Sequence, residues 1–121
     1  MSRPTSERAV VDALAEVLRG MGITVRLEAA RKAGCADMEA VLPSGQRLFL
    51  EYLPTLTAEG MAGTARRLRA ALPEGALAGV LVRRLGPGLL DACKAEGVCA
   101  FGLDGNAYVR APGVYVERYR P

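Results

Sequence analysis

The sequence predicts an α/β fold in which helices flank a central mixed β-sheet. Segments with apolar residues at helical spacing alternate along the chain with segments whose polarity alternates as in strands. An uninterrupted apolar run, Leu77 to Val82, is typical of a central strand buried on both faces. A turn tripeptide, Pro43 to Gly45, separates two alternating runs and indicates a hairpin.

The amino-terminal elements are a helix and a strand. Apolar residues at helical spacing predict an amphipathic helix over residues 5–21, and Gly20 and Gly22 lie where it would end. Residues 23–29 then alternate as a half-buried strand does. The two alternating runs of the hairpin, residues 36–42 and 46–53, follow.

The register of this hairpin decides which side chains share a face. With a three-residue loop, Leu42 faces Gln46, and the numbers of paired residues sum to 88. Asp37 then lies opposite Glu51. Side chains alternate across a strand, so one face is apolar and the other is polar. The apolar face carries Met38, Ala40, Leu42, Leu48, Leu50 and Tyr52, and the polar face carries Asp37, Glu39, Arg47 and Glu51. A loop of two or four residues would separate Asp37 from Glu51.

The second half of the chain continues the alternation of helices and strands. Helical spacing followed by Pro73 predicts a helix over residues 57–72, which precedes the apolar run. Pro87 and Gly97 mark the start and the end of a shorter helix. Three short strands around a turn at 104–106 complete the sheet: 98–101, 106–110 and 114–118.

Size and composition limit the function classes. The chain has 121 residues, of which 50% are hydrophobic and 24% charged, so we expect one domain over residues 1–121. The absence of histidine excludes Ser-His-Asp triads and histidine-containing zinc sites. No apolar run approaches the roughly 18 residues of a membrane span. This predicts a chain without membrane contact. Three widely spaced cysteines, Cys35, Cys93 and Cys99, indicate a reduced, cytoplasmic chain with buried thiols.

The predicted pair of carboxylates, Asp37 and Glu51, suggests a metal site. Like charges on directly opposite strand positions repel, so a positive charge must lie near them. Mg²⁺ or Mn²⁺ is one solution, because these ions take carboxylate oxygens as ligands and activate water for attack on phosphorus. The alternative is a solvated strand face neutralised by a basic side chain, namely Arg47, Arg26 or Arg31.

The predicted elements follow a recognisable order along the chain. A helix that contains a glutamate and a strand come first, then a hairpin with Asp37 and Glu51 on its successive strands, and then a helix, a strand and a helix. This order resembles the PD-(D/E)xK nuclease superfamily, whose restriction-endonuclease-like fold has three layers. The resemblance implies that Asp37 and Glu51 are catalytic carboxylates and ligands of Mg²⁺ or Mn²⁺. It also implies that Glu16 or Glu7 is the carboxylate of the first helix.

Two positions depart from the motif of this superfamily. Leu53 stands where the motif has lysine, and Ala36 replaces its proline. Leucine can neither position an attacking water nor stabilise charge at phosphorus, so we expect weak or no catalytic activity. The segment from Gly97 to Tyr115 also resembles the closing part of nuclease-fold domains in AbiEi-type antitoxin and regulator proteins.

Arginines supply candidate contacts to nucleic acid. The net charge is +3, which permits binding to phosphates. The candidates are Arg47, Arg66, Arg67, Arg69, Arg83 and Arg84. A solvated helix face in an arginine-rich protein is the alternative interpretation. We therefore expect association with DNA or with a nucleic-acid-processing protein. An active Mg²⁺- or Mn²⁺-dependent nuclease and a non-enzymatic homodimeric interaction module are the alternatives.

Overall fold

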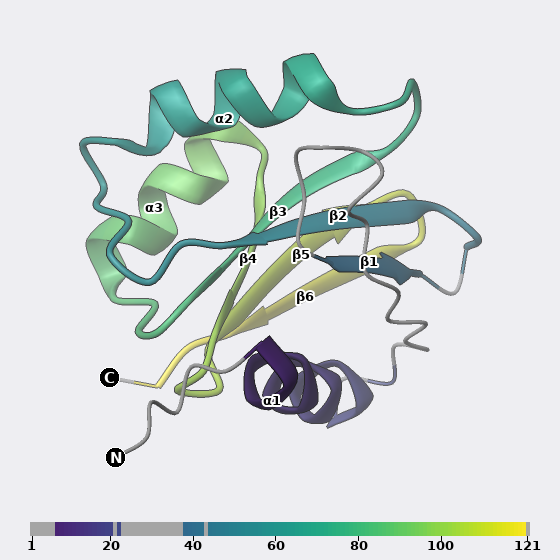
Figure 1. The fold of residues 1–121 in the computed structure, drawn as a ribbon, viewed down its shortest axis with the longest axis horizontal. Coiled ribbons are helices and arrows are strands. Elements are labelled where there is room, and N and C mark those ends of the chain that lie inside the picture. The colour runs from purple at the N-terminus through teal and green to yellow at the C-terminus, as the bar shows by residue number, and fades with distance from the viewer. Residues whose placement is uncertain (1–6, 21, 23–37, 43, 121) are drawn as a thin grey trace.

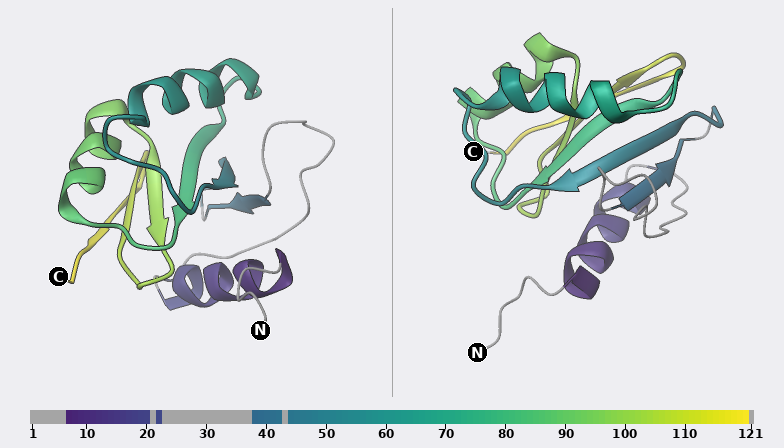
Figure 2. Two further views of the ribbon diagram at one scale, coloured as in Figure 1. Left: turned by 60° about the vertical axis from the view of Figure 1, so that its left-hand side comes forward. Right: turned by 45° about the horizontal axis from the view of Figure 1, so that its top comes forward.

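A computed structural model describes residues 7–20, 22, 38–42 and 44–120 of the chain (Figure 1). A six-stranded mixed sheet in the order β1-β2-β3-β4-β5-β6 forms its centre. Helix α1 covers one face of the sheet, and α2 and α3 cover the other (Figure 2). The elements are α1 (Glu7–Gly20), β1 (Met38–Val41), β2 (Arg47–Tyr52), α2 (Met61–Ala71), β3 (Leu77–Val82), α3 (Pro87–Glu96), β4 (Cys99–Gly102), β5 (Ala107–Ala111) and β6 (Val114–Arg118). The predicted α/β class is therefore confirmed.

The strand directions bring several loops to one edge of the sheet. Strands β2, β3 and β4 are parallel, because α2 and α3 are crossover helices between them. Strands β5 and β6 are each antiparallel to the strand before them, so β6 runs in the direction of β4. The carboxyl ends of β2, β3, β4 and β6 consequently lie at the same edge, which we call the carboxyl edge.

The hairpin has the predicted register. Met38 pairs with Leu50, and the amide of Leu42 donates to the carbonyl of Gln46 at 2.9 Å. Gly45 supplies the turn with φ of +89°, a backbone conformation that glycine adopts without steric cost. The alternatives with a two- or four-residue loop are thus wrong.

Each face of the sheet carries its own apolar cluster. The cluster under α1 contains Leu18 together with Ala40, Leu42, Leu48, Leu50, Leu81 and Phe101. Four of the apolar hairpin residues expected to share a face are therefore in it, and Tyr52 packs against it. The side chain of Met38 lies outside the described part of the chain. The cluster under α2 and α3 contains Met61, Ala65, Leu68, Val80, Val82, Leu85, Leu90, Cys93 and Ala100. The predicted polar face of the hairpin also holds Phe49, which is buried against Leu72 and Ala76.

The helix predicted over 57–72 begins later, at Met61. The amide of Gly60 donates to the carbonyl oxygen of Thr57 at 3.1 Å and to its hydroxyl at 3.2 Å, so residues 57–60 form a separate turn before the helix. Gly97 ends α3 with φ of +70°, as expected. The strand predicted over 23–29 lies outside the described residues.

The sequence also made predictions about the cysteines and about membrane-spanning segments. Cys93 and Cys99 are buried and free, as expected, and Cys35 lies outside the described residues. Burial raises the pKa of the Cys93 thiol to about 12, which keeps it protonated at neutral pH. None of the helices in the described part of the chain is long and apolar enough to cross a membrane.

Gly79 provides a test of the packing between β2 and β3. A Cβ atom at this position would lie 2.9 Å from Cδ2 of Leu50 and 3.1 Å from Cδ1 of Leu48. Both leucines are fully buried, so Gly79→Ala should lower the free energy of unfolding by about 1–3 kcal/mol. Urea denaturation measures this change.

Gly63→Ala is the matched control. Gly63 lies within α2, and nothing lies within 4 Å of a Cβ atom at this position. Alanine should therefore raise the free energy of unfolding by about 0.5–1 kcal/mol through its helix propensity. A Gly79→Ala variant as stable as the parent chain would contradict the tight packing of Gly79.

Candidate functional site

Glu51 lies near the end of β2 on the sheet face covered by α2. Its Oε1 atom accepts a hydrogen bond from Nη1 of Arg67 at 3.0 Å, and its side chain is 21% exposed. The positive charge beside Glu51 in the described residues is therefore an arginine of α2. Arg47 does not occupy this place, because it pairs with Glu39. The other two arginines considered from the sequence, Arg26 and Arg31, lie outside the described residues. Asp37, the predicted partner of Glu51, lies outside the described residues.

Arg47 forms its own ion pair across the hairpin. Its Nε atom donates to Oε2 of Glu39, and its guanidinium carbon lies 4.9 Å from the ring centroid of Phe49. The hydrogen bond to Glu39 raises the pKa of Arg47. This predicted phosphate contact is thus an exposed side chain that already has a partner.

Glu16 lies away from the hairpin carboxylates. It belongs to α1, which packs on the opposite face of the sheet, and its side chain is 80% exposed. Its Oε2 atom accepts a hydrogen bond from Arg19 at 3.5 Å. The structure therefore does not bring Glu16 together with Glu51. The described residues contain no group of three or more Cys, Asp or Glu side chains arranged to hold a metal ion.

Leu53 has a packing role. Its amide donates to the carbonyl of Leu81 at 2.9 Å, and its half-buried side chain packs against the cluster under α2 and α3. Leu56, Leu72 and Ala92 are further partly buried apolar residues that pack against this cluster. The residue that replaces the motif lysine is therefore part of the apolar packing.

The arginines predicted to form one basic surface lie in two places. Arg66, Arg67 and Arg69 belong to the second half of α2, which runs back towards the start of β3. Arg83 and Arg84 directly follow the end of β3. This strand has six residues, so at roughly 3.3 Å per residue its ends are on the order of 15 Å apart.

The two arginine groups differ in their charge partners. On α2, Arg67 pairs with Glu51, and Arg69 lies 3.7 Å from the carboxylate of Glu96. Arg66, exposed on the same helix, pairs with no acidic side chain among the described residues. The carboxyl edge carries exposed guanidinium groups that pair with no acidic side chain among the described residues. These are Arg83, Arg84, Arg118 and Arg120.

Arg118 and Arg120 were not among the arginines predicted from the sequence to contact nucleic acid. Arg118 ends β6, and Arg120 follows it. Both reach the carboxyl edge because two successive antiparallel connections return the chain to the direction of β4. The three short strands predicted near the end of the chain contained this signal, but only the sheet order places the end of β6 on the same edge of the sheet as Arg83 and Arg84.

A cavity of about 490 Å³ lies at the carboxyl edge. It is at the carboxyl ends of two adjacent parallel strands, β3 and β4. Arginines, an aromatic ring and one carboxylate contribute to its walls. The lining residues are Arg84, Leu85, Gly86, Pro87, Asp104, Asn106, Tyr119 and Arg120.

The buried side chain of Asn106 connects the walls of this cavity. Asn106 is 3% exposed, and its Nδ2 atom donates to the carbonyls of Leu85 and Arg120, each at 3.1 Å. Its Oδ1 atom accepts from the amide of Arg120 at 2.7 Å. Asn106 therefore links the loop after β3 to the residues after β6. From the sequence it was interpreted as part of a turn and as the first residue of a strand.

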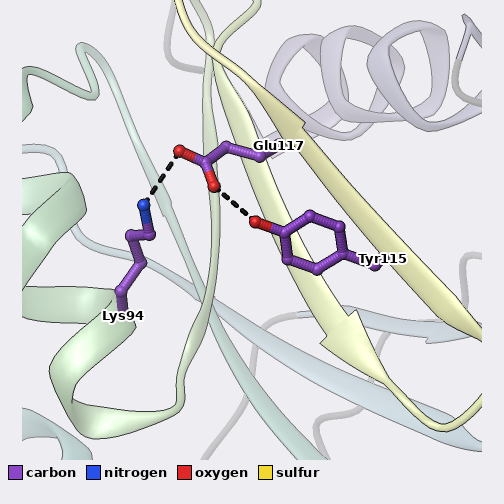
Figure 3. Close-up of polar contacts among 3 residues, drawn as sticks. All are labelled: Lys94, Tyr115 and Glu117. Atoms are coloured by element: carbon purple, nitrogen blue, oxygen red, sulfur yellow. Dashed lines mark hydrogen bonds and ion pairs between the residues drawn. The ribbon is translucent and has the colours of Figure 1, made fainter.

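A second set of polar contacts holds β6 against α3 (Figure 3). Oε2 of Glu117 accepts a hydrogen bond from Nζ of Lys94 at 2.9 Å, and Oε1 accepts from the hydroxyl of Tyr115 at 2.6 Å. The hydrogen bond from Tyr115, and then that from Lys94, lowers the pKa of Glu117. These contacts connect α3 to the strand that leads to Arg118 and Arg120.

Comparisons with known proteins do not place the chain in a family. No protein-family model, no curated protein and no solved structure matches it.

The pKa of Glu117 provides a test of the contacts in Figure 3. Because this pKa is lowered in the folded chain, the ionised carboxylate stabilises the fold above the ordinary glutamate pKa. That contribution is lost as the pH falls through the lowered value. Tyr115→Phe removes the first cause of the shift, so it should raise the pKa of Glu117 towards its ordinary value. Carboxyl-detected NMR titration measures this pKa, and an unchanged value in Tyr115→Phe would contradict the assigned cause.

Proposed function

We propose that this chain is a restriction-endonuclease-like domain that associates with nucleic acid and has weak or no catalytic activity. The observation that carries the proposal is the carboxyl edge, where arginines from separate parts of the chain lie without acidic partners among the described residues. Exposed guanidinium groups of this kind bind the phosphates of nucleic acids.

The charge balance of the carboxyl edge favours an anionic partner. Asp104 is the carboxylate that lines the cavity there, and its oxygens already accept the amides of Leu85 at 3.1 Å and Asn106 at 3.2 Å. Those contacts assign Asp104 to holding the turn. The arginine charges consequently remain available to phosphate groups from outside the chain.

The arrangement of elements supports the nuclease-like part of the proposal. A hairpin whose second strand carries Glu51 precedes a crossover helix and a buried parallel strand. This is the order on which the resemblance to the nuclease superfamily rests. The mixed sheet with helices on both faces is compatible with its three-layer fold.

The surroundings of Glu51 favour weak or no catalysis. Arg67 neutralises the carboxylate, and a cation beside a carboxylate opposes the binding of a divalent metal ion. Leu53 supplies no base or positive charge, and its side chain packs with apolar residues. The chain therefore lacks, at position 53, the lysine that the nuclease chemistry implied by the resemblance requires.

Binding to a DNA duplex tests the association. Fluorescence anisotropy of a labelled, 5′-hydroxyl duplex over a salt series should show an association constant that falls steeply as salt increases. A double variant, Arg83→Gln with Arg118→Gln, should reduce the slope of log K against log [salt] by about 2, or about 1 for each lost phosphate contact. Arg19→Gln is the control. Arg19 belongs to α1, which packs on the face of the sheet opposite to α2 and α3, so this variant should leave the slope unchanged.

Absence of binding at low salt would contradict the association with DNA. A dimer found by analytical ultracentrifugation under the same conditions would then favour the non-enzymatic interaction module.

A cleavage assay tests the catalytic part of the proposal. With Mg²⁺ or Mn²⁺ and a long duplex, the parent chain should cleave no faster than Asp37→Ala, because Leu53 replaces the motif lysine. Cleavage that is lost in both Asp37→Ala and Glu51→Gln would contradict the proposal and support the active metal-dependent nuclease.

A further inference from the structure

We propose that the cavity at the carboxyl edge binds a nucleotide through a terminal phosphomonoester. Arg84 and Arg120 contact the phosphate, and the ring of Tyr119 packs against the base. This inference rests on the proposed association with nucleic acid, because it names the part of the polymer, a phosphorylated strand end, that the cavity accepts. A free nucleoside monophosphate carries the same chemistry.

The charges of the cavity match a phosphomonoester. Arg84 and Arg120 both line the cavity, and neither pairs with an acidic side chain of the described residues. Together they carry two positive charges. The carboxylate of Asp104, which also lines the cavity and accepts main-chain amides, carries one negative charge. The resulting excess of positive charge favours an anionic group such as a phosphomonoester. Guanidinium groups also match phosphate oxygens in geometry, since each can donate two parallel hydrogen bonds.

The size of the cavity favours more than an isolated phosphate. Its volume of about 490 Å³ lies in the range of roughly 300–1,000 Å³ that is typical of small-molecule sites. Tyr119 lines the same cavity and is 37% exposed. An accessible aromatic ring beside a phosphate site is suited to stacking on a base, whichever base the nucleotide carries.

The two arginines are held in place through the main chain. Asn106 bonds to both main-chain groups of Arg120 and to the carbonyl of Leu85, the neighbour of Arg84. Asp104 also accepts the amide of Leu85 at 3.1 Å. These contacts come from within the chain, so the backbone of both walls is fixed without a ligand. Such preorganisation reduces the entropy cost of binding.

Calorimetric titration of the full chain with adenosine 5′-monophosphate, adenosine and inorganic phosphate tests the proposal. The monophosphate should bind at least about tenfold more tightly than adenosine, because only the former reaches both arginines. Arg84→Gln with Arg120→Gln should weaken monophosphate binding at least about tenfold, and Arg110→Gln should leave it unchanged. Arg110 is the matched control because it is exposed on β5 and does not line the cavity.

Tyr119→Leu separates the base from the phosphate. This variant should weaken the binding of the monophosphate and leave the binding of inorganic phosphate unchanged. Equal affinity for the monophosphate and adenosine, or full affinity in the double arginine variant, would overturn the proposal. A Tyr119→Leu variant with parental affinity for the monophosphate would overturn the assignment of the base.

Oligonucleotides distinguish the two sources of the phosphomonoester. A 5′-phosphorylated single strand that binds more tightly than its 5′-hydroxyl form, with the difference lost in Arg84→Gln with Arg120→Gln, assigns the cavity to strand ends. Equal affinities of the two strands, with tight binding of the free monophosphate, assign it to free nucleotides. Retained binding of the 5′-hydroxyl duplex together with no response to the monophosphate would refute this inference alone. If the parent chain does not bind the 5′-hydroxyl duplex at low salt, the proposed function is refuted.

Discussion

The hydrogen bonds of one buried amide, that of Asn106, hold the carboxyl edge together. Burying an amide without partners is costly, so its contacts to Leu85 and Arg120 are required for this residue to be 3% exposed. The same bonds fix the loop after β3 against the residues that follow β6. Both segments carry arginines, and their common edge is the basis for the proposed binding of nucleic acid and of a nucleotide.

The direction of the strands explains why these arginines meet. Two crossover helices make β2, β3 and β4 parallel, and two tight connections make β6 parallel to β4. Arg84 and Arg120 are far apart in sequence, yet both line one cavity. At the predicted catalytic position, in contrast, Arg67 neutralises Glu51, and Leu53 packs as an apolar residue. Among the residues that the structure describes, the positive charges at the carboxyl edge thus have no acidic partner, whereas those at the hairpin are paired.

Local patterns predicted most of the elements, because period, proline and glycine positions act over short distances. The strand Leu77–Val82 and the hairpin register are as the sequence indicated. Long-range placement was less predictable. The ion pair between Arg67 and Glu51 depends on how α2 packs over the sheet, and the cavity depends on the sheet order. A turn sequence around Asn106 gave no indication that this side chain would be buried among three segments.

The central claim is that the carboxyl edge contacts phosphate. Titration of the uniformly ¹⁵N-labelled chain with a 5′-hydroxyl DNA duplex, followed by amide NMR, measures this most directly. If the carboxyl edge contacts phosphate, the largest changes in amide chemical shift should occur at residues 83–86 and 118–120, which belong to this edge. Changes confined to α1, or to the exposed face of the β1–β2 hairpin, would contradict it.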